Sequence, residues 1–134
     1  MAQYKKTVKA RIKAKNQKIR AQREQAKRDR TYWPPQPITE RDLRVRGVNV
    51  EAFARLGICE AGRGSGAFGV RWNTPYGWTW QGGLGMYRGT HQSVGHPYER
   101  DIGQASWQTQ MLVGHRVMLK YGITAWAAHR CYYG

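Results

Sequence analysis

The chain has 134 residues, which is enough for one compact domain with an appendage and too few for two ordinary domains. It carries 23 Lys and Arg against 8 Asp and Glu, so we expect a polyanionic partner such as nucleic acid, anionic lipid or an acidic wall polymer. No run of about 18 apolar residues occurs, and no apolar segment follows Lys5 and Lys6, so we expect neither a membrane span nor a secretory signal peptide.

Residues 1–32 are predicted to form a basic N-terminal extension. Ala, Lys, Gln, Arg and Glu dominate residues 2–30, and neither Gly nor Pro interrupts them, a composition that favours a helix. Val8, Ile12 and Ile19 are its only branched apolar residues, which is too few to bury against a core. We therefore expect a basic segment, helical or disordered, that is either a solvated charged extension or binds nucleic acid or the proteins of an assembly such as a phage particle.

The segment 33–47 is predicted to be a Pro-rich linker. Three prolines fall within Trp33-Pro34-Pro35-Gln36-Pro37, where they stop a helix and favour an extended spacer. Residues 38–46 remain charged and are expected to belong to the linker or to a short approach to the domain. Residues 48–134 then form that domain.

The pattern within 48–134 predicts an α+β fold, mainly helical with a short hairpin. Asn49 can cap a helix whose apolar residues follow one buried face, and the glycines between 62 and 66 should end it near Glu60. Gly and aromatic residues dominate 67–90, with β-prone pieces around 67–72 and 76–81. A second helix is expected from about Gln104 to Tyr121, and a short terminal one within 123–131.

Glu60 is the candidate for acid catalysis. It lies at the C-terminal end of the first predicted helix, beside its apolar face, where the helix dipole and partial desolvation both disfavour the ionised carboxylate. A carboxylic acid that keeps its proton can protonate a glycosidic oxygen. Position alone also fits a surface glutamate at a helix end.

Aromatic residues are concentrated in the same part of the chain. Flat rings stack on the apolar faces of sugars, and Trp can also donate its N–H to a sugar hydroxyl. The alternative for each ring is core packing. The rings concerned are Trp72, Tyr76, Trp78, Trp80, Tyr87, Trp107 and Trp126.

Five short motifs, in order over residues 50–131, resemble the catalytic domain of actinobacterial resuscitation-promoting factors. They are Cys59-Glu60-Ala61-Gly62, Gly82-Gly83-Leu84, Gly89-Thr90, Ala105-Ser106 with Gln110, and Gly122 to Trp126 followed by Cys131. Departures occur at Gln81, Gly85 and His91, where the family has Tyr, Gln and Trp. The chain also has more residues between Cys59 and Gly82, so the family's polar groove contacts do not transfer in detail.

The resemblance implies a small lysozyme-like fold, similar to lysozymes and soluble lytic transglycosylases. It implies a disulfide between Cys59 and Cys131 and the role of catalytic acid for Glu60. It also implies that Thr90 lines the sugar groove. The further residues expected to contact substrate are Trp80, Gln81, Tyr121 and Trp126.

The predicted activity is cleavage of peptidoglycan strands between N-acetylmuramic acid and N-acetylglucosamine. One carboxylate suits a lytic transglycosylase or an inverting hydrolase, and Glu99 and Asp101 are the weaker candidates for a second group. We expect no cofactor and no metal, because the four histidines share no metal-like spacing. They are His91, His96, His115 and His129.

The expected site of action is the cell wall, outside the cytoplasm, since a disulfide needs an oxidising compartment. A phage protein carried in a virion or released during lysis would reconcile this with the missing signal peptide. Two other functions remain open at this point. One is a non-catalytic component of an assembly that binds glycan or protein, and the other is nucleic-acid binding through residues 1–30.

Overall fold

The computed structural model describes the backbone of residues 2–134 and the side chains of residues 6–24 and 32–134. The chain divides into two compact units, Met1–Tyr32 (unit 1) and Trp33–Gly134 (unit 2). Helices dominate, with one two-stranded antiparallel hairpin in unit 2, so the predicted α+β class is confirmed. In the part of the chain that is described, no helix combines the length and the apolarity needed to cross a bilayer.

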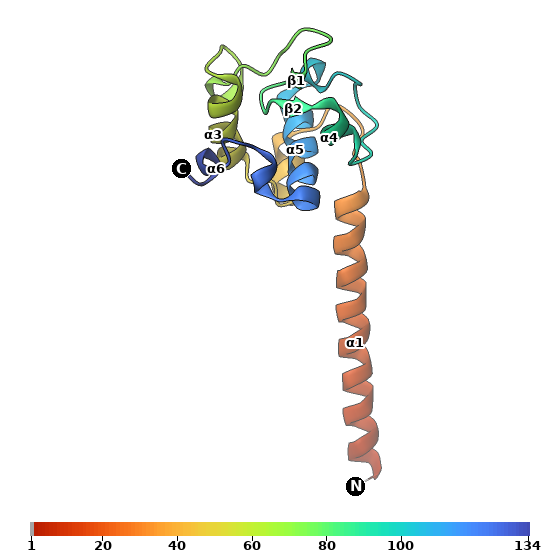
Figure 1. Cartoon of the computed structure of the whole chain (residues 1–134). Coiled ribbons are helices and arrows are strands. Elements are labelled where there is room, and N and C mark those ends of the chain that lie inside the picture. Colours follow the sequence, from red (N-terminus) through yellow and green to blue (C-terminus); the bar gives the residue numbers. More distant parts are fainter. Residues whose placement is uncertain (1) are drawn as a thin grey trace. The chain divides into compact units, whose positions relative to one another are not determined.

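Unit 1 is a helix, α1 (Ala2–Thr31), drawn in red and orange in Figure 1. None of its described side chains is buried: Ile12 and Ile19 are 55% and 36% exposed, and Val8 is half-buried. The helix therefore rests on the propensity of its Ala, Lys, Arg and Gln residues and on its length, because no apolar face of it is packed away.

Unit 2 begins with the segment 33–47, and here the prediction of a linker is corrected. Trp33 packs edge-on against Tyr98, whose hydroxyl donates to the carbonyl of Pro34 at 2.6 Å. Ile38 and Leu43 are buried in the core of unit 2. The prolines stop α1, as predicted, but apolar residues before and after them pack the segment against the core of unit 2.

A short helix, α2 (Glu40–Val45), lies within this segment. Thr39 caps it: its hydroxyl accepts from the Asp42 N–H, and the Asp42 carboxylate accepts from the Thr39 N–H. This reciprocal pair satisfies two backbone donors that a helix start would otherwise leave open. The Thr39-x-x-Asp42 spacing is visible in the sequence, but no helix was predicted here.

Helix α3 (Val50–Ala61) follows as predicted. The Asn49 side chain accepts from the Ala52 N–H at 3.1 Å and caps the first turn. Phe53 and Leu56 lie fully buried on its inner face. The helix ends at Gly62, whose φ of 89° breaks the helical path, so Glu60 sits in the last turn.

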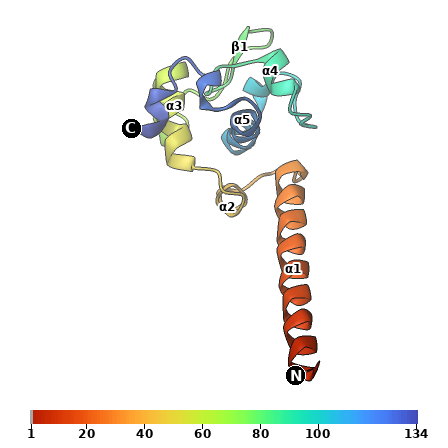
Figure 2. The same cartoon turned by 60° about the horizontal axis from the view of Figure 1, so that its bottom comes forward.

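Helix α5 (Trp107–Tyr121) is the central helix of unit 2, and Figures 1 and 2 show the other elements of this unit around it. Ser106 caps its start by accepting from the Thr109 N–H. Every residue from Thr109 to Val117 is buried. At Gly114 a Cβ atom would come within 2.5 Å of Leu84, so glycine is what allows the hairpin segment to approach this closely.

The hairpin pairs β1 (Trp80–Gln81) with β2 (Met86–Tyr87). The β-prone piece at 67–72 does not pair with it; it contains the turn η1 (Ala67–Gly69) and an isolated bridge from Val70 to Arg63. The remaining elements are α4 (Arg88–Gln92), η2 (Ile102–Gln104), η3 (Ile123–Ala125) and α6 (Arg130–Tyr133).

Cys59 and Cys131 form a disulfide, with 6.5 Å between their Cα atoms, and this predicted pairing is confirmed. The bond ties the last turn of α3 to α6, and the two helices lie side by side in Figures 1 and 2. The Arg55 guanidinium adds a hydrogen bond to the Tyr132 carbonyl at 2.8 Å. The C-terminus therefore holds the end of α3 that carries Glu60.

Candidate active-site cleft

A cleft of about 420 Å³ opens at the C-terminal end of α3. One side is formed by the helix end and by the segment that returns along it, and the other by the loop and strand of the hairpin. The cleft is lined by Glu60, Ala61, Arg71, Thr74, Trp78, Thr79, Trp80, Gly82 and Gly85. Glu60 is the one carboxylate among these lining residues.

Glu60 is half-buried, and one of its oxygens is held by the backbone. The Ala128 N–H donates to Oε1 at 3.2 Å, so the loop after η3 fixes the orientation of the carboxyl group. The other oxygen, Oε2, lies on the side of Gly85, which lines the cleft. Oε1 is therefore bonded to the backbone, and Oε2 is the oxygen on the cleft side.

Gly85 keeps the space beside Glu60 open. It has a φ of 56°, which favours glycine, and a Cβ atom there would lie 3.4 Å from Glu60 Oε2. A longer side chain at this position would stand against the carboxyl group. Glycine at position 85 therefore leaves the cleft open beside the Glu60 carboxyl group.

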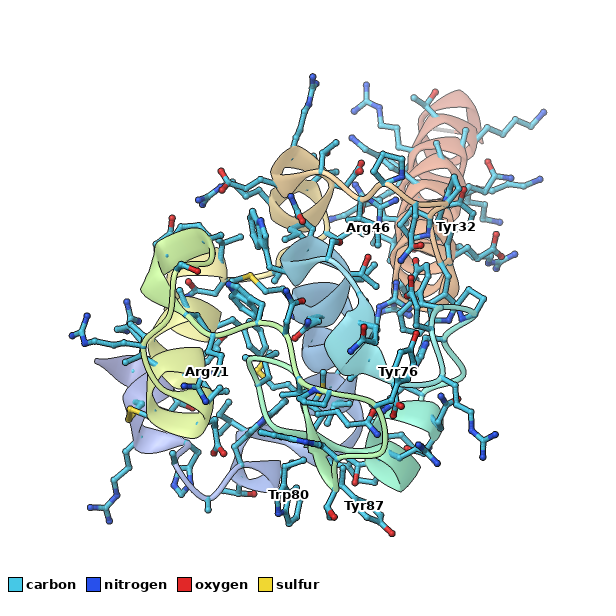
Figure 3. All side chains as sticks on the ribbon, turned by 90° about the horizontal axis from the view of Figure 1, so that it is seen from above. Tyr32, Arg46, Arg71, Tyr76, Trp80 and Tyr87 are labelled. Atoms are coloured by element: carbon cyan, nitrogen blue, oxygen red, sulfur yellow. A yellow bond between two sulfur atoms is a disulfide. The ribbon has the colours of Figure 1, made fainter. Side chains whose placement is uncertain are left out.

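Exposed aromatic rings line the rim of the cleft and continue beyond it. Trp78 and Trp80 are 48% and 63% exposed, and Tyr76 and Tyr87 are exposed as well. The Trp80 and Tyr87 rings, paired across the hairpin, are 5.9 Å apart between centroids, and Figure 3 shows them next to each other. Large rings are costly to leave in water, and a group of exposed rings beside a cleft could stack on flat, partly apolar ligands such as sugars.

Buried hydrogen bonds hold the backbone of the hairpin in place. The Gly82 N–H donates to Thr74 Oγ1 at 2.9 Å, and the Gly83 N–H donates to Gln110 Oε1 at 2.8 Å. The Gln110 amide group in turn donates to the Trp72 and Ala105 carbonyls. The cleft wall is thus anchored to α5 and does not depend on its two-residue strands alone.

A directed chain of hydrogen bonds supports the same wall from behind. The Tyr98 N–H donates to His96 Nδ1 at 3.2 Å, so His96 Nε2 carries the proton and donates to His91 Nδ1 at 2.9 Å. His91 Nε2 then donates to Gln81 Oε1 at 2.9 Å, and the Gln81 amide group donates to the Trp78 carbonyl at 3.2 Å. Both imidazoles must be neutral for this chain to form.

Burial favours the same neutral state of the two histidines. It lowers the pKa of His91 to about 4, with His96 and Arg88 adding to the effect, and it lowers the pKa of His96. Protonation of either ring would place a donor against a donor and break the chain. The position of Trp78 in the wall is therefore linked to the charge state of a histidine pair outside the cleft.

Trp78 and Thr79 form a ridge that also lines a second hollow, of about 470 Å³. Arg88 lines it and pairs with Asp101 at 3.0 Å, while the other Asp101 oxygen accepts from the Gly77 N–H at 3.0 Å. The Gly77 N–H and then the Arg88 guanidinium lower the pKa of Asp101. Asp101 is therefore an ionised group that holds the ridge and is not among the residues of the Glu60 cleft.

The predicted site residues fall into two groups. Glu60 and Trp80 line the cleft. Gln81 and Trp126 were expected to contact substrate, but both are buried: Gln81 supports the ridge, and the Trp126 indole donates to the Leu84 carbonyl at 2.8 Å. Their roles are corrected to packing and positioning.

Thr90 and Tyr121 also lie apart from the residues that line the cleft. The Thr90 carbonyl accepts from the Ser93 hydroxyl, and that hydroxyl lies 2.6 Å from the Tyr121 hydroxyl. The structure adds Arg71, Thr74 and Thr79 to the cleft. No sequence pattern pointed to these three, because chain segments distant from Glu60 bring them there.

Over the described residues, no group of three or more His, Cys, Asp or Glu side chains could hold a metal ion. Comparisons with family models, with curated proteins and with solved structures return no match for this chain. The function is therefore inferred from the geometry of the cleft and from its residues.

Proposed function

We propose that unit 2 is a glycosidase that cleaves peptidoglycan between N-acetylmuramic acid and N-acetylglucosamine, with Glu60 as its catalytic acid. The observation that carries the proposal is the position of Glu60: it is the one carboxylate lining an open cleft whose rim holds two exposed tryptophans. An acid beside stacking surfaces is what a glycosidase needs in order to hold a sugar ring and to protonate its leaving oxygen.

The chemistry begins with the proton on Glu60 Oε2. Transfer of that proton to the glycosidic oxygen breaks the bond from the muramic C1 and leaves an oxocarbenium-like centre. The Glu60 carboxylate then accepts the proton of the muramic 6-hydroxyl, whose oxygen attacks C1. The product is a 1,6-anhydro sugar, no water is consumed, and Glu60 is protonated again.

The two other acidic candidates support this one-carboxylate scheme by their positions. Asp101 is committed to Arg88 and to the Gly77 N–H, and Glu99 accepts from the Gln36 amide group. Neither lines the cleft. With no second carboxylate among the lining residues to serve as nucleophile or base, the lytic transglycosylase route is favoured over two-carboxylate hydrolysis.

Other lining groups suit a wall substrate. Trp78 and Trp80 offer ring faces to the sugars, and Thr79 offers a hydroxyl between them. Arg71, exposed at the cleft and labelled in Figure 3, supplies a cation for the carboxylates of the peptides attached to muramic acid. The proposed place of action is the cell wall, where an oxidising environment would preserve the Cys59–Cys131 bond.

The decisive experiment compares the native chain with Glu60→Gln on purified actinobacterial cell walls. Loss of the acid should slow wall clearance by at least about 100-fold, the usual contribution of general acid catalysis. Glu51→Gln is the matched control, since it makes the same chemical change in the first turn of the same helix, and it should clear walls at the native rate. Equal rates for native and Glu60→Gln would refute the proposal.

Mass spectrometry of the released fragments identifies the reaction. Transglycosylation gives anhydro ends that are lighter than hydrolytic reducing ends by one water. A second variant separates catalysis from simple binding: Trp80→Ala should reduce binding to wall glycan whether or not the bond is cleaved. Glycan binding without cleavage by the native chain would instead indicate a non-catalytic binding component.

A further inference from the structure

We propose that α1 binds double-stranded DNA by lying in the major groove. The inference concerns unit 1 alone and does not depend on the activity of the cleft. Between residues 6 and 24, where side chains are described, eight are basic and one, Glu24, is acidic. The basic residues are Lys6, Lys9, Arg11, Lys13, Lys15, Lys18, Arg20 and Arg23.

These charges are arranged around the helix in a specific pattern. At about 3.6 residues per turn, Val8, Ile12 and Ile19 fall on one line along α1. Basic residues flank that line on both sides: Arg11 and Lys15 on one, and on the other Lys9, Lys13, Arg20 and Arg23. The helix thus presents a narrow apolar line between two cationic flanks.

Between residues 6 and 24, the face opposite the apolar line carries no charge. Ala10, Ala14, Gln17 and Ala21 follow one another there at helical spacing, and all four are exposed. The basic residues therefore occupy about two thirds of the circumference and leave a small neutral back. A helix that only needed charge for solubility would have no reason to leave one face without it, so the pattern points to a partner on the cationic side.

A membrane surface and a second helix fit this pattern poorly. A helix that lies in a bilayer interface needs a broad apolar face, whereas α1 offers one line of three branched residues. A coiled coil needs a seam sustained over three or four heptads, and Lys15 interrupts the line between Ile12 and Ile19. Two copies of α1 would also bring like-charged flanks together.

The major groove of B-form DNA fits it well. Its width of about 12 Å accepts a helix of about 10–12 Å, and phosphates line both of its walls. An inserted helix therefore needs cations on both flanks and uncharged side chains along the line that faces the bases, and its back, which faces solvent, needs no cations. Single-stranded DNA is disfavoured because residues 6–24 contain no aromatic ring for stacking, and the major groove of duplex RNA is too narrow.

The test measures binding of the full chain to a fluorescent DNA duplex of random sequence as the salt concentration is raised. We expect affinity to fall by about 1,000-fold between roughly 50 and 200 mM salt, as for a protein that neutralises about six phosphates. The variant Lys9→Gln with Lys13→Gln and Arg20→Gln removes three cations from one flank. Its log–log salt slope should be shallower by about 3, since each lost phosphate contact contributes about 0.9.

The matched control is Ala10→Gln with Ala14→Gln and Ala21→Gln, which introduces the same residue three times on the neutral back. It should bind DNA as the native chain does, and circular dichroism verifies that both triple variants remain equally helical. The duplex RNA, the single strand of the same sequence, and vesicles of phosphatidylserine are the competing ligands. Equal loss in both variants, or tighter binding to any competing ligand than to duplex DNA, overturns the proposal.

Discussion

The two units of this chain contain helices that form for different reasons. In unit 2, α5 has nine consecutive buried residues, from Thr109 to Val117, and its helical shape is enforced by contacts on every side. In unit 1, α1 is twice as long, and none of its described side chains is buried. Helix α5 is part of a core, whereas the described side chains of α1 are exposed to solvent or half-buried.

The comparison teaches that stability and function can be separated along a chain. Unit 2 should unfold cooperatively, since one hydrophobic core joins residues from α2, α3, the hairpin and α5. Unit 1 should lose helix gradually, because each residue contributes only its own propensity and its own hydrogen bond. All six tryptophans lie in unit 2, so their fluorescence reports its unfolding, while circular dichroism also reports α1.

Acidification should have the largest effect and should act on unit 2 alone. Burial lowers the pKa of His91 and of His115 to about 4, so the folded unit keeps both rings neutral after the unfolded chain has taken up protons. Stability is therefore complete above pH 6.5 and falls as pH decreases from 6.5 towards 4, by up to about 3 kcal/mol for each ring. Urea unfolding followed by tryptophan fluorescence at several pH values measures the loss.

His115 offers a way to divide this effect. Its Nδ1 is buried and has no hydrogen-bond partner among the described residues, so His115→Leu removes a proton-binding group without breaking a bond at that atom. Between pH 7.5 and pH 4 the variant should lose about 3 kcal/mol less stability than the native chain, because His115 no longer takes up a proton on unfolding. The rest of the loss should stay, because His91 and His96 still titrate. An unchanged pH dependence in this variant would contradict the assignment.

Removal of the disulfide should have the next largest effect. Cys59→Ser with Cys131→Ser opens a loop of 72 residues and should lower the free energy of unfolding of unit 2 by about 4 kcal/mol. The measurement is the midpoint of urea unfolding by tryptophan fluorescence, and the reduced native chain should behave like the double variant. The helicity of α1 should not change, and a loss there would mean that the two units are coupled.

A glycine in α1 should have the smallest effect. Ala14→Gly lies on the exposed neutral face and should cost α1 about 1 kcal/mol of helix stability, which circular dichroism detects as lost helicity at room temperature. The fluorescence transition of unit 2 should keep its midpoint. Ala14→Gln is the control, because it changes the side chain while keeping a good helix former, and a shift of the fluorescence midpoint by either variant would show that unit 1 supports unit 2.

The sequence alone determined the features that depend on near neighbours in the chain. Helix α3 begins after Asn49 and ends at Gly62, as predicted from their preference for helix ends, and Glu60 therefore falls in its last turn. The uninterrupted helix formers of residues 2–30 likewise predicted α1. The Cys59–Cys131 pairing followed from the family resemblance and not from local physics, and the structure confirms it.

Only the tertiary structure decided what distant segments do to one another. The proline-rich segment belongs to unit 2 because Trp33 packs against Tyr98 and Ile38 is buried in the core. These contacts are made with residues far along the chain. Gln81 and Trp126 became buried supports for the same reason. The local sequence indicates whether a residue is polar or apolar and whether it favours a helix or a strand. Whether its side chain lies in the core or lines the cleft depends on how distant segments pack together.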